Sequence, residues 1–303
     1  MTSGIHAQED SLDQYFGDFG GLFELDSIVV SASRSGFNLD DFVEMVQQDT
    51  SFYKSFRQLR FTNYQSTHRL QMFDKKGKNR SHYNSKLVQK IDGLCRQVEF
   101  LEEDYADNFF KKKRKHRFYT GKLLDVLFQR AACESQYASS VDDGEAASKS
   151  SRTGKHIQEL KKLIFQPGQK ANVPMIGGKT AIFEKKMAPY YNFSITSKIY
   201  KGTIDCYVFK AELRPEFQTN KQDKTVVKFL ETYFNKDDFA IVARNYHLAY
   251  YGALYDFDVK MEIECKAFGE SFLPARINYD GFWDIPGRKP EIGKFSIVIE
   301  NPS

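Results

Sequence analysis

The stretch YDFDVKMEIEC, residues 255–265, alternates apolar and charged side chains along its whole length. Its odd-numbered positions carry aromatic, aliphatic or cysteine side chains, and its even-numbered positions carry Asp, Lys or Glu. Because successive side chains of a β-strand point to opposite faces, this pattern predicts a strand with one packed face and one hydrated face. Such a strand is typical of an antiparallel sheet that faces water on one side.

Further strand patterns flank this one and are separated by short turns. Strands are predicted at 200–213, 224–234, 239–251, 254–267, 272–279 and 294–300. Strands joined by short turns form a meander and not crossover α/β units. Upstream, residues 61–120 also follow a period of two, and Asp92-Gly93 is a strong hairpin turn. The strands therefore predict a mainly antiparallel sheet.

Helical patterns and one polar region divide the chain. Helices are predicted near 38–60, 120–135 and 155–165. Residues 139–153 contain almost no apolar side chains, which is typical of a mobile loop. The expected segments are an extended lead-in at 1–37, a helix plus β-hairpin region at 38–138, the mobile loop at 139–153 and the meander at 154–303. We expect the meander and 38–138 to form one continuous domain of the α+β class.

The composition is unusual mainly in its aromatic residues. The 303 residues include 27 Phe, 17 Tyr and one Trp, or 15% of the chain. That exceeds what one thin sheet needs. The surplus is explained either by a wide apolar concavity or by a filled core plus a protein-binding face. The 44 Lys and Arg nearly balance the 40 Asp and Glu, which argues against a nucleic-acid-binding protein.

The motif search excludes several kinds of chemistry. No C-x-x-C pair or paired histidine spacing suggests zinc. Gly177-Gly178-Lys179-Thr180 lacks the earlier glycine of a phosphate-binding loop, because position 173 is Val. The acidic side chains between 256 and 264 indicate a hydrated strand face more simply than a calcium site. No nucleophile, base and orienting group occur in a known pattern, so we predict a non-enzyme without metal or cofactor.

The four cysteines leave a question about disulfides. They lie far apart in the sequence, at Cys95, Cys133, Cys206 and Cys265. The last two fall in apolar strand patterns, where a free cysteine is an ordinary small core residue. A bridge between Cys206 and Cys265 is the alternative if the compartment is oxidising. The sequence leaves the two states open.

Residues 111–117, KKKRKHR, are the strongest local charge feature. Aromatic pairs on both sides suit a hairpin that projects from the sheet. The run is interpreted as a solvated hairpin tip, as a contact for anionic lipid headgroups, or as a nuclear-localisation or nucleic-acid patch. The residues assigned to an anionic-surface contact are Lys111, Lys112, Lys113, Arg114, Lys115 and Arg117.

The first residues carry a hint about the compartment. Residues 5–8 followed by the acidic residues 9–11 resemble the small-residue end of a secretory signal and a mature N-terminus. The basic start and apolar run of such a signal do not precede them. We interpret the chain as exported.

The order of motifs after residue 230 resembles a known family. ETYF (231–234) leads through the acidic turn NKDD (235–238) into FAIV (239–242), and FLPARI (272–277) and YDGFWD (279–284) follow. This order resembles the periplasmic lipoprotein-carrier family and related envelope proteins, over the C-terminal half only. The resemblance implies a curved or unclosed antiparallel β-barrel with a few helices packed on its open side. It also implies that a lipid or acyl chain is carried in an aromatic-lined cavity without chemistry.

Together these observations predict a non-enzymatic, periplasm-facing envelope protein that holds or shuttles a lipid or lipoprotein acyl group. The expected partners are a lipid or an acylated protein, with peripheral membrane contact and no nucleic acid. The expected location is periplasmic or outer-membrane-associated in a bacterium. The predicted cavity-lining residues are Phe229, Tyr233, Tyr246, Leu248, Tyr250, Phe257 and Met261. The alternative is a structural or adaptor subunit of an envelope protein assembly.

Overall fold

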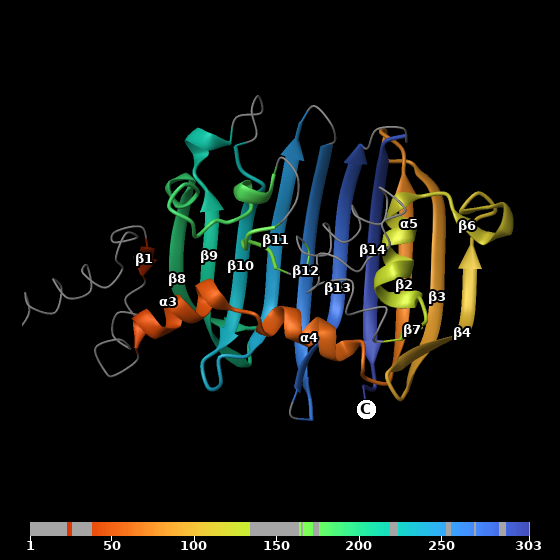
Figure 1. Cartoon of the computed structure of the whole chain (residues 1–303), viewed down its shortest axis with the longest axis horizontal. Helices are drawn as coiled ribbons and strands as arrows, with labels where there is room; N and C mark the ends of the chain where they lie inside the picture. Colours follow the sequence, from red (N-terminus) through yellow and green to blue (C-terminus); the bar gives the residue numbers. More distant parts are fainter. Residues whose placement is uncertain are drawn as a thin grey trace, which may run out of the picture.

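The computed structural model describes residues 23–25, 38–133, 164, 166–171, 176–218, 224–252, 256–269, 271–284 and 289–302. A 12-stranded sheet dominates it, with the strand order β1-β8-β9-β10-β11-β12-β13-β14-β2-β3-β4-β7 (Figure 1). All neighbouring strands are antiparallel except β1 and β8, which are parallel. The predicted α+β class with mainly antiparallel strands is confirmed.

The strands of the sheet and a separate two-stranded hairpin have defined bounds. The sheet strands are β1 (Phe23–Leu25), β2 (Tyr64–Phe73), β3 (Asn79–Asp92), β4 (Cys95–Tyr105), β7 (Ala132–Cys133), β8 (Tyr191–Tyr200), β9 (Ile204–Leu213), β10 (Val227–Asn235), β11 (Ile241–Tyr251), β12 (Asp256–Phe268), β13 (Ser271–Asp284) and β14 (Glu291–Glu300). The hairpin strands are β5 (Phe110–Lys111) and β6 (Lys115–His116).

The alternating stretch from which the sequence argument started is β12. Its buried side chains are Phe257, Val259, Met261, Ile263 and Cys265, and the residues between them are less buried. The neighbours of β12 are β11 and β13, both antiparallel to it. The predicted one-sided strand is therefore confirmed.

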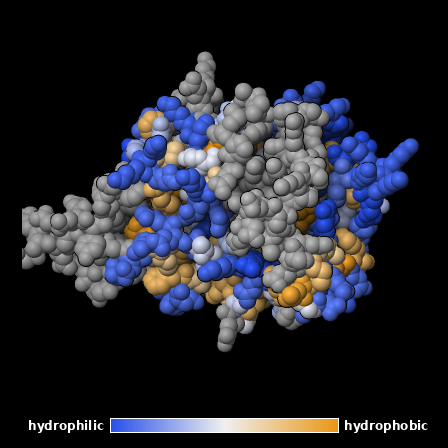
Figure 2. Space-filling view, in the orientation of Figure 1, coloured by the Kyte–Doolittle hydropathy of each residue, from blue (hydrophilic) through white to orange (hydrophobic). Residues whose placement is uncertain are grey.

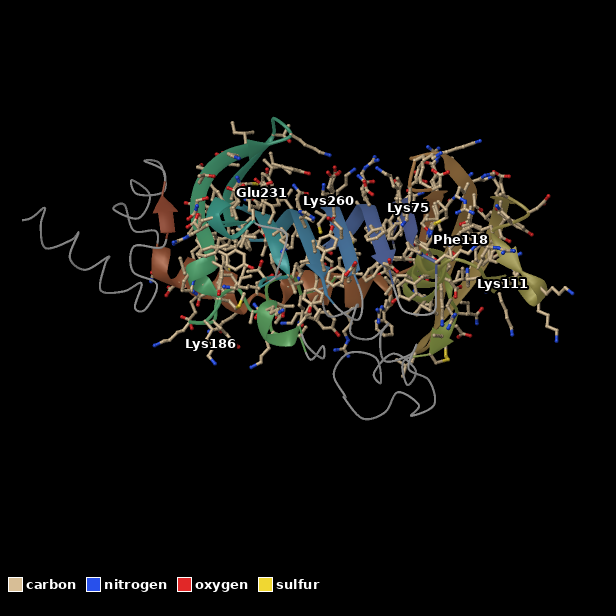
Figure 3. The ribbon with its side chains drawn as sticks, turned by 90° about the horizontal axis from the view of Figure 1, so that it is seen from above. Lys75, Lys111, Phe118, Lys186, Glu231 and Lys260 are labelled. Atoms are coloured by element: carbon tan, nitrogen blue, oxygen red, sulfur yellow. A yellow bond between two sulfur atoms is a disulfide. The ribbon has the colours of Figure 1, made fainter. Side chains whose placement is uncertain are left out.

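The two halves of the chain share this one sheet, because the C-terminal strand β14 pairs with β2 along its whole length. The sheet begins at β1 and ends at β7 and is not closed into a barrel. Figure 3 shows that its β8–β9 end curves toward the side that carries the helices. The expected curved, unclosed sheet is confirmed.

The helices of the described residues lie on one side of the sheet (Figure 1). They are α3 (Leu39–Gln48), α4 (Ser51–Leu59) and α5 (Tyr119–Leu124), which continues into a π-helical turn, η3 (Asp125–Gln129). Short 3-10 helices occupy Lys112–Arg114 (η2), Gly177–Lys179 (η4), Ala188–Tyr190 (η5) and Pro215–Phe217 (η6). The helices predicted near 38–60 and 120–135 are confirmed. The predicted loop at 139–153 lies outside the described residues, as does the helix near 155–165 except for Ile164, which is helical.

We call the helix-bearing side, to which Tyr246 and Met261 belong, the inner face. The opposite side, to which His247 and Lys260 belong, is the outer face. In Figure 3 the labelled Glu231 and Lys260 lie on the outer side, away from the helices.

Local sequence explains how α3 and α4 begin and what they bury. Asn38 caps α3, since its Oδ1 accepts a hydrogen bond from the Asp41 N–H at 3.2 Å. Phe52, Phe56 and Leu59 follow helical spacing in α4 and are buried. In the part of the chain that the structure describes, no helix has the length and apolarity to cross a membrane.

The cysteine question is settled by the structure. Cys95 of β4 and Cys133 of β7 form a disulfide, a pairing that the sequence reasoning did not weigh. Cys206 and Cys265 are free and buried. Burial raises the pKa of Cys206 to about 11 and that of Cys265 to about 12, so both thiols remain protonated.

Candidate functional site

Five of the predicted cavity-lining residues lie together on the inner face. Tyr246, Leu248 and Tyr250 come from β11, and Phe257 and Met261 come from β12. Tyr246 pairs with Met261 and Tyr250 pairs with Phe257 across the two strands. All five are at most 6% exposed and belong to the main hydrophobic core. They form the centre of a continuous apolar layer.

The other two predicted residues, Phe229 and Tyr233 of β10, lie on the outer face. Phe229 pairs with His247, and the Lys210 ammonium lies 5.6 Å from its ring centroid. Tyr233 packs with Tyr200 at 5.0 Å between ring centroids. On β10 the inner positions are Leu230, Thr232 and Phe234, so the two odd-numbered aromatic residues face the other way. These two residues therefore do not belong to the inner-face layer in this structure.

An ion pair beneath the helices holds the α3–α4 junction to the inner face. The Arg244 guanidinium of β11 lies 2.9 Å from the Asp49 carboxylate, and the two side chains are only 8% and 6% exposed. Arg244 Nε also donates to Thr232 Oγ1 at 2.9 Å, and its guanidinium lies 4.4 Å from the Phe52 ring centroid. The charge on the apolar face is thus neutralised by the segment that covers it.

Residues outside α3 and α4 also contact the aromatic side chains of the inner face. The Tyr246 hydroxyl lies 2.7 Å from the Ile164 carbonyl oxygen and 3.1 Å from Met261 Sδ. Burial raises the pKa of Tyr246, which keeps its hydroxyl a neutral hydrogen-bond donor. The Lys179 ammonium lies 4.8 Å from the Tyr250 ring centroid. In this structure the cover packs directly on the inner face.

The outer face is hydrated and carries a histidine–aspartate pair. His247 Nε2 lies 2.8 Å from Asp258 Oδ1, and the Tyr251 hydroxyl donates to Asp258 Oδ2 at 3.0 Å. Burial raises the pKa of Asp258, but the hydrogen bonds and charges of His247, Tyr251 and Lys260 together outweigh burial and hold that pKa below its usual value. Asp258 of β12 is therefore an anion in contact with His247 and Tyr251 of β11. These contacts across the two strands stabilise the pairing of β11 and β12.

The basic run forms the expected hairpin, β5–η2–β6, at the β4 end of the sheet. Lys111, Lys112, Lys113 and Lys115 are exposed. Arg114 instead folds back onto Glu103 of β4, with its guanidinium 4.9 Å from the Phe110 ring centroid. Arg117 Nε donates to the Asn108 carbonyl at 2.7 Å. Figure 2 shows hydrophilic residues in the upper part of this end of the molecule and hydrophobic residues below them.

The sequence pattern did not predict the buried ion pair or the disulfide that hold distant parts of the fold together. Arg244 occupies an even-numbered, inner position beside the apolar Tyr246, Leu248 and Tyr250 of the same strand. That signal could have marked it as a buried charge that needs a partner. Asp49 follows α3 directly and carries no comparable signal, because its partner is 195 residues away. The Cys95–Cys133 bridge likewise depends on the pairing of β4 with β7.

No family model and no curated protein matches the sequence. Three solved structures are similar to the chain: an outer membrane lipoprotein-sorting protein domain from Vibrio parahaemolyticus, a DUF1329 family protein from Desulfovibrio piger and a LolA superfamily protein from Nitrosomonas europaea. Their identities are 8%, 8% and 10%, and their TM-scores are 0.28, 0.25 and 0.23. The matches cover 83%, 83% and 82% of this chain and 92%, 89% and 91% of the others.

All three TM-scores are below 0.5, and these similarities assign no function to this chain.

Proposed function

We propose that the protein is a non-enzymatic, periplasm-facing carrier that holds a lipid or lipoprotein acyl group between the inner face and the α3–α4 segment. Tyr246, Leu248, Tyr250, Phe257 and Met261 line the site in this proposal. The observation that carries it is the continuous apolar layer of the inner face, covered by α3 and α4 at Arg244 and by residues 164 and 179 at Tyr246 and Tyr250. An acyl chain needs such a layer and a cover that can move.

Approximate energies favour an exchange between the cover and an acyl chain. The helices bury six apolar side chains: Phe42, Val43, Val46, Phe52, Phe56 and Leu59. At about 1.5–3 kcal/mol for each side chain, their burial contributes roughly 9–18 kcal/mol. An acyl chain of about 14 methylenes contributes roughly 11 kcal/mol at about 0.8 kcal/mol per methylene. The two contributions are comparable, so a chain can replace the helices reversibly.

The buried ion pair favours the closed state when no lipid is bound. If α3–α4 moved away from the sheet, Arg244 would lose Asp49 and remain on an apolar face. A buried charge without its partner is costly, so an empty site closes. A bound acyl chain offsets this cost only by filling the apolar layer.

The disulfide supports the proposed compartment. Cys95 and Cys133 are bonded, and protein disulfides persist mainly in oxidising compartments such as the bacterial periplasm. The exposed lysines of the β5–β6 hairpin suit a peripheral contact with anionic lipid headgroups, at about 1 kcal/mol for each basic residue near the surface.

A cross-link between the cover and the sheet tests the proposal. Gln58 of α4 donates a hydrogen bond to Ser271 of β13 at 2.5 Å, so a Gln58→Cys/Ser271→Cys variant can be bridged by a short bismaleimide. Cys206 and Cys265 are buried and react poorly with the reagent. The cross-linked protein should bind a fluorescent long-chain fatty acid at least about tenfold more weakly than the untreated variant, a change of about 1.4 kcal/mol.

Gln58→Cys and Ser271→Cys single variants, treated with the same reagent, control for modification of one side chain. They should bind the fatty acid like the wild type. Unchanged binding by the cross-linked double variant would show that the ligand does not enter beneath α4, and the proposed site would be wrong.

One observation favours the adaptor alternative. Strand β4 exposes Phe100, Leu101 and Tyr105, and the turn before it exposes Leu94. Among the described residues, β4 pairs with β7 only at Cys95 and Arg96. An exposed strand edge with apolar side chains can pair with a strand of another protein. A stoichiometric partner captured by cross-linking on β4 would support the adaptor, and a lipid adduct without such a partner would favour the carrier.

A further inference from the structure

A second site lies at the β4 end of the sheet, away from the inner-face residues of β11 and β12. A pocket of about 520 Å³ opens between β3–β4, the β5–β6 hairpin and the α5–η3 segment. Five strands of the sheet separate β11 from β4. The volume falls in the usual range for a small-molecule site, about 300–1,000 Å³.

The lining of this pocket is basic. Its cationic side chains are Arg114, Lys115, Lys122 and Arg130, and His116 lies beside them. Asp125 is a lining carboxylate, and it lies 2.6 Å from Arg130 and 3.5 Å from His116. Glu103, behind the pocket, pairs with Arg114. Four Lys and Arg side chains line the pocket beside the one lining carboxylate, Asp125, and this lining favours an anionic ligand.

Asp125 is itself an anion held in place by its partners. Burial raises its pKa, but the hydrogen bonds and charges of His116 and Arg130 outweigh burial and hold the pKa below its usual value. This carboxylate therefore fixes Arg130 and His116 at the wall of the pocket. Lys115 and Lys122, from the hairpin and α5, extend the positive lining.

The aromatic part of the lining favours a flexible chain over a planar base. Tyr83 is stacked between Phe109 and Tyr105, with ring centroids at 5.0 and 6.3 Å. The Arg114 guanidinium covers the Phe110 ring at 4.9 Å. Phe100 is 39% exposed, so its ring remains open to a ligand. Among the lining rings a nucleotide base would therefore find Phe100 alone on which to stack, whereas a hydrocarbon chain can also pack on ring edges.

We propose that this pocket binds an amphiphile that carries a phosphate group. Lys115 and Lys122 hold the phosphate together with the guanidinium groups of Arg114 and Arg130, and the apolar chain packs against Phe100. Charge-assisted hydrogen bonds to a phosphate are stronger than neutral ones, and guanidinium groups suit its geometry. The phosphate belongs either to a dissolved amphiphile or to a headgroup in a membrane, and the exposed lysines of the same hairpin suit both.

Titration with lysophosphatidic acid, below its micelle concentration, tests this site on the full chain. A Lys115→Glu/Lys122→Glu variant should bind it at least about tenfold more weakly than the wild type. The matched control is Lys75→Glu/Lys76→Glu, with the same charge change on the exposed turn between β2 and β3 outside the pocket, and it should change the affinity less than about twofold. Equal losses in both variants would overturn the proposal.

A second pair of variants tests the apolar contact without changing charge. Phe100→Ala should weaken binding of lysophosphatidic acid about threefold or more, whereas Leu101→Ala, an exposed neighbour outside the pocket, should not. Both side chains are exposed, so both variants should fold, which their melting temperatures will show. Unchanged binding by Phe100→Ala, or tighter binding of adenosine monophosphate than of lysophosphatidic acid, would overturn the proposal.

Other probes separate the two sources of the phosphate. A dissolved ligand predicts binding of monomeric lysophosphatidic acid that exceeds binding of inorganic phosphate and of lysophosphatidylcholine. A membrane headgroup predicts that vesicles with phosphatidic acid also bind, and that Lys115→Glu/Lys122→Glu reduces this binding. If inorganic phosphate binds as well as both lipid probes, the ligand is not an amphiphile. Loss of fatty-acid binding in the α4–β13 cross-linked protein, with lysophosphatidic acid binding retained, would show that the two sites are independent.

Discussion

The inner face of β11–β12 and the α5 end of the sheet both bury polar side chains, but they hold their covers differently. Over β11, the Arg244–Asp49 pair joins the α3–α4 cover to an otherwise apolar layer. At the α5 end, His68, Gln129 and Ser85 form a buried hydrogen-bond network, and Arg96 donates to the carbonyls of residues 127 and 130.

The two kinds of contact, apolar packing and a polar network, determine whether each covering segment can move away from the sheet. Apolar packing is non-directional, so another apolar group can replace the α3–α4 segment. A buried network in which the polar groups are hydrogen-bonded to one another is stable in one arrangement. The Cys95–Cys133 disulfide adds a covalent bond between β4 and β7. We therefore expect α3–α4 to move and α5 to stay in place.

The largest effect should come from Asp49→Ala, which leaves Arg244 buried without its carboxylate. Loss of one partner of a buried pair costs about 3–5 kcal/mol of unfolding free energy. Denaturant unfolding measures it. The double variant Asp49→Leu/Arg244→Met is the control and should regain most of the loss, because it removes both charges. A double variant as unstable as Asp49→Ala would show that apolar packing cannot replace this pair.

The next effect should come from Cys95→Ser/Cys133→Ser at the α5 end. The two residues are 38 apart, and a loop of that size predicts a loss of about 4 kcal/mol, commonly about 2–5 kcal/mol. Thermal and denaturant unfolding measure it. Fatty-acid affinity should stay unchanged, because the disulfide does not touch the inner-face residues. A loss of fatty-acid binding in folded protein would contradict the separation of the two regions.

An intermediate effect should appear as a pH dependence that His68 causes. Burial, with a smaller contribution from Arg96, lowers its pKa from 6.5 to about 3. Below pH 6.5 the unfolded chain takes up a proton that the folded protein does not, so stability falls as pH falls from about 6.5 toward 3. Between pH 7 and pH 5 this should amount to about 2 kcal/mol, at about 1.4 kcal/mol per pH unit.

His68→Asn removes the titrating group but keeps a neutral polar side chain, and it should lack this part of the pH dependence. Unfolding of both proteins at pH 7 and pH 5 provides the comparison. Parallel losses in the wild type and His68→Asn would mean that His68 is not the group responsible.

The smallest effect should come from the cap of α3. Asn38→Ala removes the hydrogen bond to the Asp41 N–H and should cost about 1 kcal/mol. Thr50→Ala at the start of α4 is the matched control, because the Thr50 side chain makes no cap hydrogen bond. Equal melting temperatures for the two variants would show that the α3 cap contributes nothing measurable.

The sequence pattern predicted individual strands and helices better than it predicted which strands pair with one another. Alternation identified β12 and its buried face, and Asn38 marked the start of α3, because both signals are local. Pairing of β14 with β2 brings together residues more than 200 positions apart, and no local signal encodes it. Strand β8 was missed because the strand prediction began only at residue 200.

The candidate site shows the same limit. Five of the predicted residues share the inner-face positions of β11 and β12, whereas Phe229 and Tyr233 occupy outer-face positions of β10. The pocket at the β4 end combines a hairpin, a strand edge and a π-helical turn, so its lining could not be assembled without the tertiary fold. The basic run was the only sequence signal for it.

Native mass spectrometry of the protein, purified gently from the envelope fraction of its own host, tests the central claim most directly. The account predicts a reproducible lipid adduct that disappears after organic extraction, and that the α4–β13 cross-linked apoprotein cannot take up again. A bare mass from correctly folded protein, with no lipid regained on incubation with envelope lipids, would contradict the carrier proposal.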